Sequence, residues 1–244
     1  MAVGRCSTSQ LAIHSSAQTL DKTVENLVKR DSFYLRGSLL ALTLALTSLA
    51  VPLRAHPQGD FYENKWIRDR SVDWMFTDTF PSNAWRDRVN DADGPWNAVG
   101  TSMHFVKQPE VNDFNALNCP SSYQKNGIHI GPIDGTPIND NTLARTYRCI
   151  FSGTNEWYSF QIKFDVEEPW YTGASTPPPA FAFDLQAVAT HEFGHATGFT
   201  GHFGGGSSYC TETPKQTMCP TLAKGKAYPR SLETHDKHTF QNAY

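Results

Sequence analysis

The clearest alternation of apolar and polar residues lies at positions 157–166. Its apolar members are Tyr158, Phe160, Ile162, Phe164 and Val166. A period of two is typical of a β-strand, and the polar residues between them predict that one face packs in a core while the other meets solvent. Shorter apolar runs at 103–106, 128–130 and 145–151 predict further strands.

Three segments have the pattern of helices. Residues 82–98 carry apolar side chains at helical spacing, and Gly94-Pro95 interrupts them, which predicts a helix broken near its end. A helix at about 185–199 follows Asp184, a good N-terminal cap, and begins with a mostly apolar turn. A last helix is expected to run to the C-terminus, with Ser231 as its predicted N-cap.

An apolar run near the N-terminus defines where the folded domain starts. Residues 39–51 are weakly polar throughout, with basic residues before them and a proline after them. Spanning a membrane takes about 20 apolar residues, so the run is too short for a transmembrane helix. Its basic flank and apolar core have the form of a secretory signal cleaved near Ala50 or Ala55. An uncleaved anchor is the alternative. The predicted division is a leader at 1–55, an N-terminal arm at 56–75, and one domain at 76–244 that becomes irregular from about 200.

Composition excludes several classes of function. Apolar residues make up 39% of the chain and charged residues 18%, which is typical of a globular protein rather than a disordered one. The formal net charge of −3 is too small to give the protein a strong positive or negative electrostatic potential. Nothing therefore indicates binding to nucleic acid or to an anionic membrane. We expect a secreted monomer with no stable membrane insertion after signal cleavage.

The cysteines fit an oxidising compartment. Cys6 lies in the leader, which leaves Cys119, Cys149, Cys210 and Cys219 in the mature chain. Four thiols there imply two disulfides in one of three possible pairings, and we favour Cys119–Cys149 and Cys210–Cys219 because each pair is nearest in sequence. Zinc binding by the thiolates is the alternative, but no C-x-x-C spacing occurs.

The strongest chemical signal is the segment His191-Glu192-Phe193-Gly194-His195. On a helix, residues four apart share a face, so His191 and His195 would present both imidazoles to one Zn²⁺ ion. Glu192 follows the first histidine and would lie beside the metal, where a carboxylate can take a proton from zinc-activated water. The motif alone has false positives, but an apolar preceding turn and an exported chain favour it.

A third ligand is expected shortly after the helix. Gly198 permits the left-handed turn by which the chain would leave the helix and fold back toward the metal. His202 follows in a flexible stretch and would complete three protein ligands with one open position, as catalytic zinc requires.

These residues resemble a known family. Residues 184–202 are similar to the zinc-binding segment of the metzincins, above all the matrixins, whose pattern is H-E-x-x-H-x-x-G-x-x-H followed by a methionine turn. Met218, in Gln216-Thr217-Met218-Cys219-Pro220, resembles that turn, and a Cys210–Cys219 bridge would hold the loop before it. The resemblance covers roughly residues 75–244 and is strongest from about residue 157.

One position departs from the family pattern. The third histidine would fall on Gly201, whereas His202 comes one residue later. We expect the chain beyond Gly198 to absorb the extra residue. The rival ligands are His235, His238, Glu212 and Glu233. We interpret His235 and His238 as surface residues of the last helix, and His104 and His129 as ordinary strand histidines.

The resemblance implies both a fold and a function. The fold would be α+β and metzincin-like: a twisted, mostly parallel sheet with an active-site helix, and a small irregular C-terminal subdomain that ends in a helix. A substrate would lie extended along an edge strand above the metal, for which 157–166 is our candidate, and Tyr228 would stabilise the carbonyl. Structural calcium is common in the family, although no loop here demands it.

We therefore predict a secreted zinc endopeptidase that acts on a protein or peptide substrate, with Glu192 as general base. Two alternatives remain open. One is a catalytically inactive binding protein of the same fold, which the shifted histidine would favour. The other is a zinc amidase that acts on cell-wall material.

Overall fold

The computed structural model describes residues 5–12, 65–66, 71–109, 126–133, 142–151, 153, 156–203, 208–211 and 213–244, with the backbone alone for 5–12 and 65–66. The chain divides into two compact units, Met1–His14 with Pro57–Tyr244, and Ser15–His56. The second unit, with the apolar run of the predicted signal, lies outside the described residues. None of the described helices combines the length and apolar character that crossing a bilayer requires.

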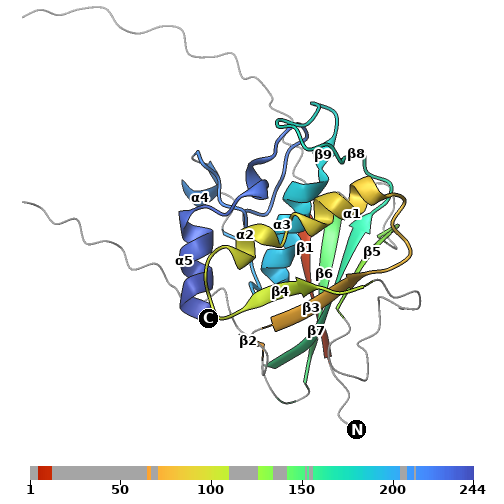
Figure 1. Ribbon diagram of the computed structural model, residues 1–244. Helices are drawn as coiled ribbons and strands as arrows, with labels where there is room; N and C mark the ends of the chain where they lie inside the picture. Colours follow the sequence, from red (N-terminus) through yellow and green to blue (C-terminus); the bar gives the residue numbers. More distant parts are fainter. Residues whose placement is uncertain are drawn as a thin grey trace, which may run out of the picture. The chain divides into compact units, whose positions relative to one another are not determined.

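Seven of the described strands form one twisted sheet in the order β1-β6-β7-β5-β3-β4, and β2 pairs with β7 beside that path (Figure 1). The strands are β1 (Arg5–Ala12), β2 (Lys65–Trp66), β3 (Ser71–Phe76), β4 (His104–Lys107), β5 (Gly127–Gly131), β6 (Thr142–Ile150) and β7 (Glu156–Asp165), with β8 (Trp170–Tyr171) and β9 (Phe183–Asp184) as a separate pair. Within the sheet β6 is antiparallel to both neighbours, and the other pairings are parallel. The prediction of a mostly parallel sheet is confirmed.

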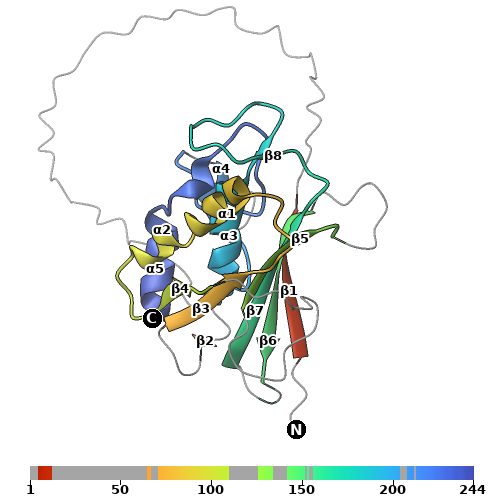
Figure 2. The same cartoon turned by 45° about the vertical axis from the view of Figure 1, so that its right-hand side comes forward.

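The helices lie on one face of this sheet in both views (Figures 1 and 2). They are α1 (Asn83–Asn90), α2 (Gly94–Asn97), α3 (Leu185–Ala196), α4 (Ser208–Thr211), the 3-10 helix η1 (Tyr228–Arg230) and α5 (Thr234–Ala243). The predicted break in the first helical segment falls just before Gly94, which begins α2 with Pro95 in its first turn. The segment after α3 is largely irregular and ends in α5, as predicted.

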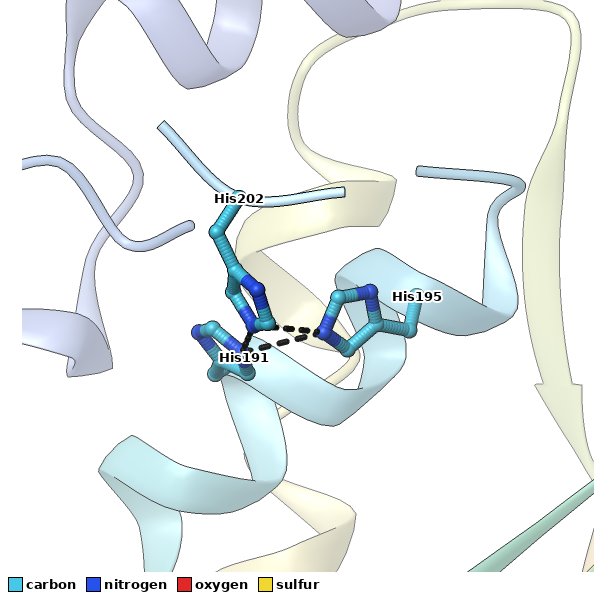
Figure 3. Close-up of side chains that lie close together, drawn as sticks. All are labelled: His191, His195 and His202. Carbon is cyan, nitrogen blue, oxygen red and sulfur yellow. Dashed lines mark hydrogen bonds between the residues drawn. The ribbon is translucent and has the colours of Figure 1, made fainter. Parts of the chain in front are cut away.

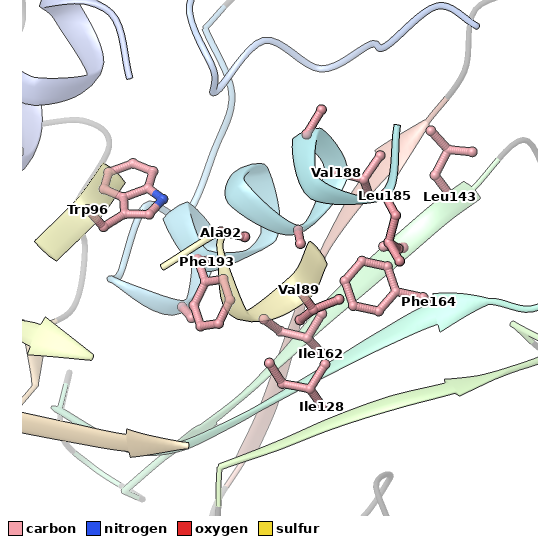
Figure 4. Packing of buried hydrophobic residues seen from close by; sticks show 14 of the residues in the cluster. Val89, Ala92, Trp96, Ile128, Leu143, Ile162, Phe164, Leu185, Val188 and Phe193 are labelled. Carbon is pink, nitrogen blue, oxygen red and sulfur yellow. The ribbon is translucent and has the colours of Figure 1, made fainter. Parts of the chain in front are cut away.

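The core fills the space between α3 and the sheet. Nearly every residue of α3 is buried, which is the pattern of a central helix rather than a surface one. Leu185, Val188 and Phe193 of α3 belong to the same buried cluster as Ile162 and Phe164 of β7 (Figure 4). This packing fixes α3 relative to the strands, and therefore fixes any chemistry that α3 carries.

Two segments that the sequence analysis left outside the domain belong to the sheet. β3 starts at Ser71, inside the predicted arm 56–75, and its alternate residues Val72, Trp74 and Phe76 are buried. The alternation of apolar and polar residues in β3 is short, and the polar residues between the buried ones made the segment look like part of a polar arm. β1 lies inside the predicted leader 1–55 and pairs antiparallel with β6.

The prediction that residues 157–166 form an edge strand is wrong. β7 lies inside the sheet, because the chain returns through β6 on one side and β5 lies on the other. Its supposed solvent face is also covered: Ser159 and Gln161 are buried, and Gln161 Oε1 lies 2.9 Å from His129 Nε2 on β5. The strand that contacts Glu192 of α3 is β6, through the hydroxyl of Thr146.

The last helix begins later than predicted. Its N-cap is Glu233 rather than Ser231, because Ser231 is the C-cap of η1 and the buried Leu232 follows it. The Asp236 carboxylate, one turn into α5, accepts a hydrogen bond of 3.0 Å from the Glu233 backbone N–H. An acidic group here satisfies a helix-end donor that would otherwise have no partner.

Candidate metal centre

Helix α3 presents two imidazoles on one face. Its start is fixed by Asp184, whose Oδ1 accepts a hydrogen bond of 2.9 Å from the Ala187 backbone N–H. His191 and His195 then follow one turn apart, both buried. The helix ends at Ala196, three residues before the predicted end, so the chain is free to turn directly after the second imidazole.

The chain after α3 turns at a glycine and is held in place by two buried aromatic residues. Gly198 has a φ of 112°, in the left-handed region that favours glycine. Phe199 and Phe203 are buried on either side of His202, their ring centroids 5.5 Å apart, and the Phe203 backbone N–H donates to the Met218 carbonyl at 3.0 Å. These anchors hold His202 over the helix even though it lies one residue beyond the family position.

The three histidines converge on one point (Figure 3). The Nε2 atoms of His191, His195 and His202 lie 3.1 Å from one another in all three pairs. His191 Nδ1 lies 2.7 Å from the Thr217 carbonyl oxygen, and His195 Nδ1 lies 2.6 Å from that of Phe199. A carbonyl only accepts, so in both rings Nδ1 carries the proton and Nε2 carries a lone pair.

Such a cluster needs a cation. Burial lowers the pKa of His191 to about 3 and of His202 to about 4, and also lowers that of His195. All three rings are therefore neutral at pH 7, and the Nε2 lone pairs of His191 and His195 point to the centre of the cluster, where His202 Nε2 also lies. Imidazole nitrogens at 2.0–2.1 Å from one tetrahedral ion would be about 3.4 Å apart, close to the observed spacing, so the donor set fits zinc.

Glu192 lies next to the first histidine and is fully buried. Its Oε2 accepts a hydrogen bond of 2.5 Å from the Thr146 hydroxyl on β6, and its Oε1 is buried without a partner among the described residues. Burial raises the pKa of Glu192 to about 8, while the hydrogen bond from Thr146 and the charges of Arg148 and Arg145 act in the opposite direction. A carboxyl group with a pKa near neutrality can both take up and release a proton.

Met218 packs directly beneath the helix that carries the histidines. It is buried, and a Cβ atom added to Gly194 would lie 2.2 Å from Met218 Sδ and 2.7 Å from Trp96 Cζ2. Gly194 therefore lets the methionine and the tryptophan approach the helix backbone between the two imidazoles. The methionine forms a floor under this turn of α3.

We expect Gly194→Ala to destabilise the protein by about 1–3 kcal/mol, because overpacking in a close-packed core forces its neighbours to move. Helix propensity alone predicts a gain of about 1 kcal/mol for the same change, so the sign of the effect is diagnostic. The matched control is Gly94→Ala, where an added Cβ meets nothing within 4 Å. Urea unfolding of both variants measures the difference, and a neutral or stabilised Gly194→Ala protein would contradict the packing described here.

A carboxylate from α5 holds the methionine turn. Asp236 is buried and accepts hydrogen bonds from the backbone N–H groups of Thr217 at 2.7 Å and of Met218 at 3.1 Å. The Thr217 carbonyl in turn fixes the ring of His191. Sequence reasoning missed Asp236, and the available signal was an acidic residue in the first turn of a helix near the methionine motif.

The remaining candidates do not join the cluster. In the described part of the chain, the group that can hold a metal consists of His191, His195 and His202. His235 packs against Tyr209 with the ring centroids 4.3 Å apart and the rings tilted, and His238 is exposed. Glu233 caps α5, and Glu212 lies outside the described residues.

Tyr228 has a different contact from the one expected. Its hydroxyl donates to the Thr221 carbonyl at 2.5 Å, and burial raises its pKa to about 12. The ring therefore braces the segment between the methionine turn and η1. Sequence reasoning proposed it as a carbonyl stabiliser, and no described contact joins it to the histidines.

One of the two expected disulfides is present. Cys210 and Cys219 form a bridge that closes the loop between His202 and the methionine turn. Cys149 is also disulfide-bonded, but the expected partner Cys119 lies outside the described residues. The backbone of Cys6 in β1 lies opposite Cys149 in the sheet register.

Comparison with protein-family models identifies the family of the chain. The family model described as Matrixin matches residues 65–244, which is more than half of the chain and includes every residue of the cluster. The comparison with curated proteins found no match.

Proposed function

Because the chain belongs to the matrixin family of zinc metallopeptidases, we propose that it is a secreted zinc endopeptidase that hydrolyses peptide bonds. The observation that carries the proposal is the convergence of three imidazole Nε2 atoms beside a buried carboxylate. In this proposal His191, His195 and His202 hold one zinc ion and Glu192 is the general base.

The protein's own groups account for binding and for proton transfer. When bound, zinc acts as a Lewis acid that polarises the scissile carbonyl and makes water a stronger nucleophile. The Thr217 and Phe199 carbonyls keep the Nε2 lone pairs of His191 and His195 directed at the metal position. Glu192 takes one proton from the attacking water and then passes it to the leaving amine, so the carboxylate is regenerated.

Secretion is part of the proposal, and two features support it. The Cys210–Cys219 disulfide is the kind of bond that persists in an oxidising compartment. The apolar run at 39–51 has the form of a secretory signal. Cleavage of such a signal would release a soluble enzyme that meets protein or peptide substrates outside the cell.

The test measures zinc content and casein hydrolysis for the wild type and for Glu192→Gln. We expect one zinc per chain in both proteins, and a loss of about 10²- to 10⁴-fold in activity for the variant, the usual contribution of a general base. Glu167→Gln, at an exposed glutamate, is the matched control and should behave as the wild type.

Other outcomes identify the alternatives. A zinc-containing protein that leaves denatured casein intact but cleaves peptidoglycan would be an amidase. A protein without stoichiometric zinc would be an inactive relative that binds its partners without catalysis. Full activity of Glu192→Gln would remove the glutamate from the mechanism.

A further inference from the structure

One hydroxyl on the sheet contacts the carboxylate of the active-site helix. Thr146 lies in β6, is completely buried, and is 46 residues away from Glu192 in sequence. Its Oγ1 is 2.5 Å from Glu192 Oε2 and 3.3 Å from the Glu192 backbone oxygen. The contact therefore reaches both the side chain and the backbone of one residue.

The two oxygens of this carboxylate have different surroundings. Oε2 accepts the hydrogen bond from Thr146, whereas Oε1 is buried and has no partner in the part of the chain that the structure describes. A buried carboxylate oxygen without a partner is costly unless something else uses it. Fixing one oxygen orients the plane of the group and leaves the other available to accept a proton.

Threonine suits this task because its side chain is stiff and its backbone is held. β-Branched residues have few χ1 rotamers, so the hydroxyl has little freedom. The backbone of Thr146 is paired with Ile162 of β7, in register with the neighbouring pairs of the β6–β7 ladder. The hydroxyl is thus presented to Glu192 from a rigid part of the sheet rather than from a loop.

We propose that Thr146 is a positioning residue for catalysis: its hydroxyl holds Glu192 Oε2 so that Oε1 faces the reacting water. This inference rests on the proposed role of Glu192 as general base. Thr146 itself touches neither the histidines nor the substrate in this account, so its effect should appear in the rate of the chemical step.

The experiment compares Thr146→Val, which removes the hydroxyl at nearly constant volume, with Thr146→Ser, which keeps it. We expect Thr146→Val to lower kcat by about 10- to 100-fold, the usual cost of losing a group that orients an active-site residue. KM and zinc content should stay within about twofold of the wild type, and Thr146→Ser should restore most of kcat. Thr142→Val, at a buried threonine of the same strand, is the control and should leave kcat unchanged.

A double variant separates this inference from the proposed function. In the Glu192→Gln background, Thr146→Val should cost little further activity, because residues that act as a unit are not additive. If Glu192→Gln is inactive but Thr146→Val keeps the wild-type kcat, the role of Thr146 is refuted and the proposed function stands. If Glu192→Gln is fully active, the proposed function itself fails. Where the valine variant does not fold, Thr146→Ala removes the same hydroxyl without placing a methyl group against the carboxylate and gives the same decision.

Discussion

Substituting His202 with alanine should release zinc from the purified protein and abolish hydrolysis of casein. Three imidazoles leave one open position for chemistry, and two imidazoles alone form an incomplete site. Zinc supplies several kcal/mol of transition-state stabilisation, and 1.36 kcal/mol corresponds to a factor of ten, so the expected loss in kcat/KM is about 10³-fold or more. Metal analysis after dialysis, together with the initial rate of hydrolysis, measures both effects.

The matched control is His238→Ala, which removes an exposed imidazole from α5 and should leave zinc content and rate unchanged. The experiment also decides the question raised by the one-residue shift after Gly198. If His202→Ala retains one zinc per chain and full activity, the third ligand is another group. The convergence of Nε2 atoms at 3.1 Å would then have no functional meaning.

The sequence predicted those parts of the site that depend on neighbouring residues. His191 and His195 are four residues apart, and helix geometry places such a pair on one face whatever the rest of the chain does. Gly198 stands where the chain must turn, and its φ of 112° is one that other residues rarely adopt. The Cys210–Cys219 bridge joins residues that are close in sequence, so proximity alone was sufficient to pair them.

The parts that depend on distant residues could not be read from the sequence. Which strand lies next to Glu192 is decided by how β6 and β7 pair, and the stronger alternation of β7 pointed to the wrong strand. Thr146 reaches Glu192 across 46 residues, and Asp236 reaches Thr217 across 19. A single buried threonine or aspartate has no periodicity, so no local pattern could show its partner.

Substituting Arg230 with methionine should destabilise the protein by about 3–5 kcal/mol, because it leaves a buried carboxylate without its partner. The guanidinium Nε lies 3.0 Å and 2.8 Å from the two oxygens of Asp184, whose side chain is fully buried. Its Nη1 and Nη2 donate to the carbonyls of Ala174 and Gly173 at 2.7 Å and 2.9 Å. One side chain from η1 therefore joins the cap of α3 to the loop before it.

Urea unfolding of the zinc-saturated protein measures the loss, with Arg88→Met as the control. Arg88 pairs with Asp91 at 2.9 Å near the surface, where a salt bridge contributes about 0–1 kcal/mol. Adding Asp184→Asn to Arg230→Met should recover part of the stability, because asparagine still caps the helix but carries no charge that needs a partner. If Arg230→Met costs no more than Arg88→Met, the buried pair does not hold the start of α3. The position of His191 must then depend on the methionine turn and the core alone.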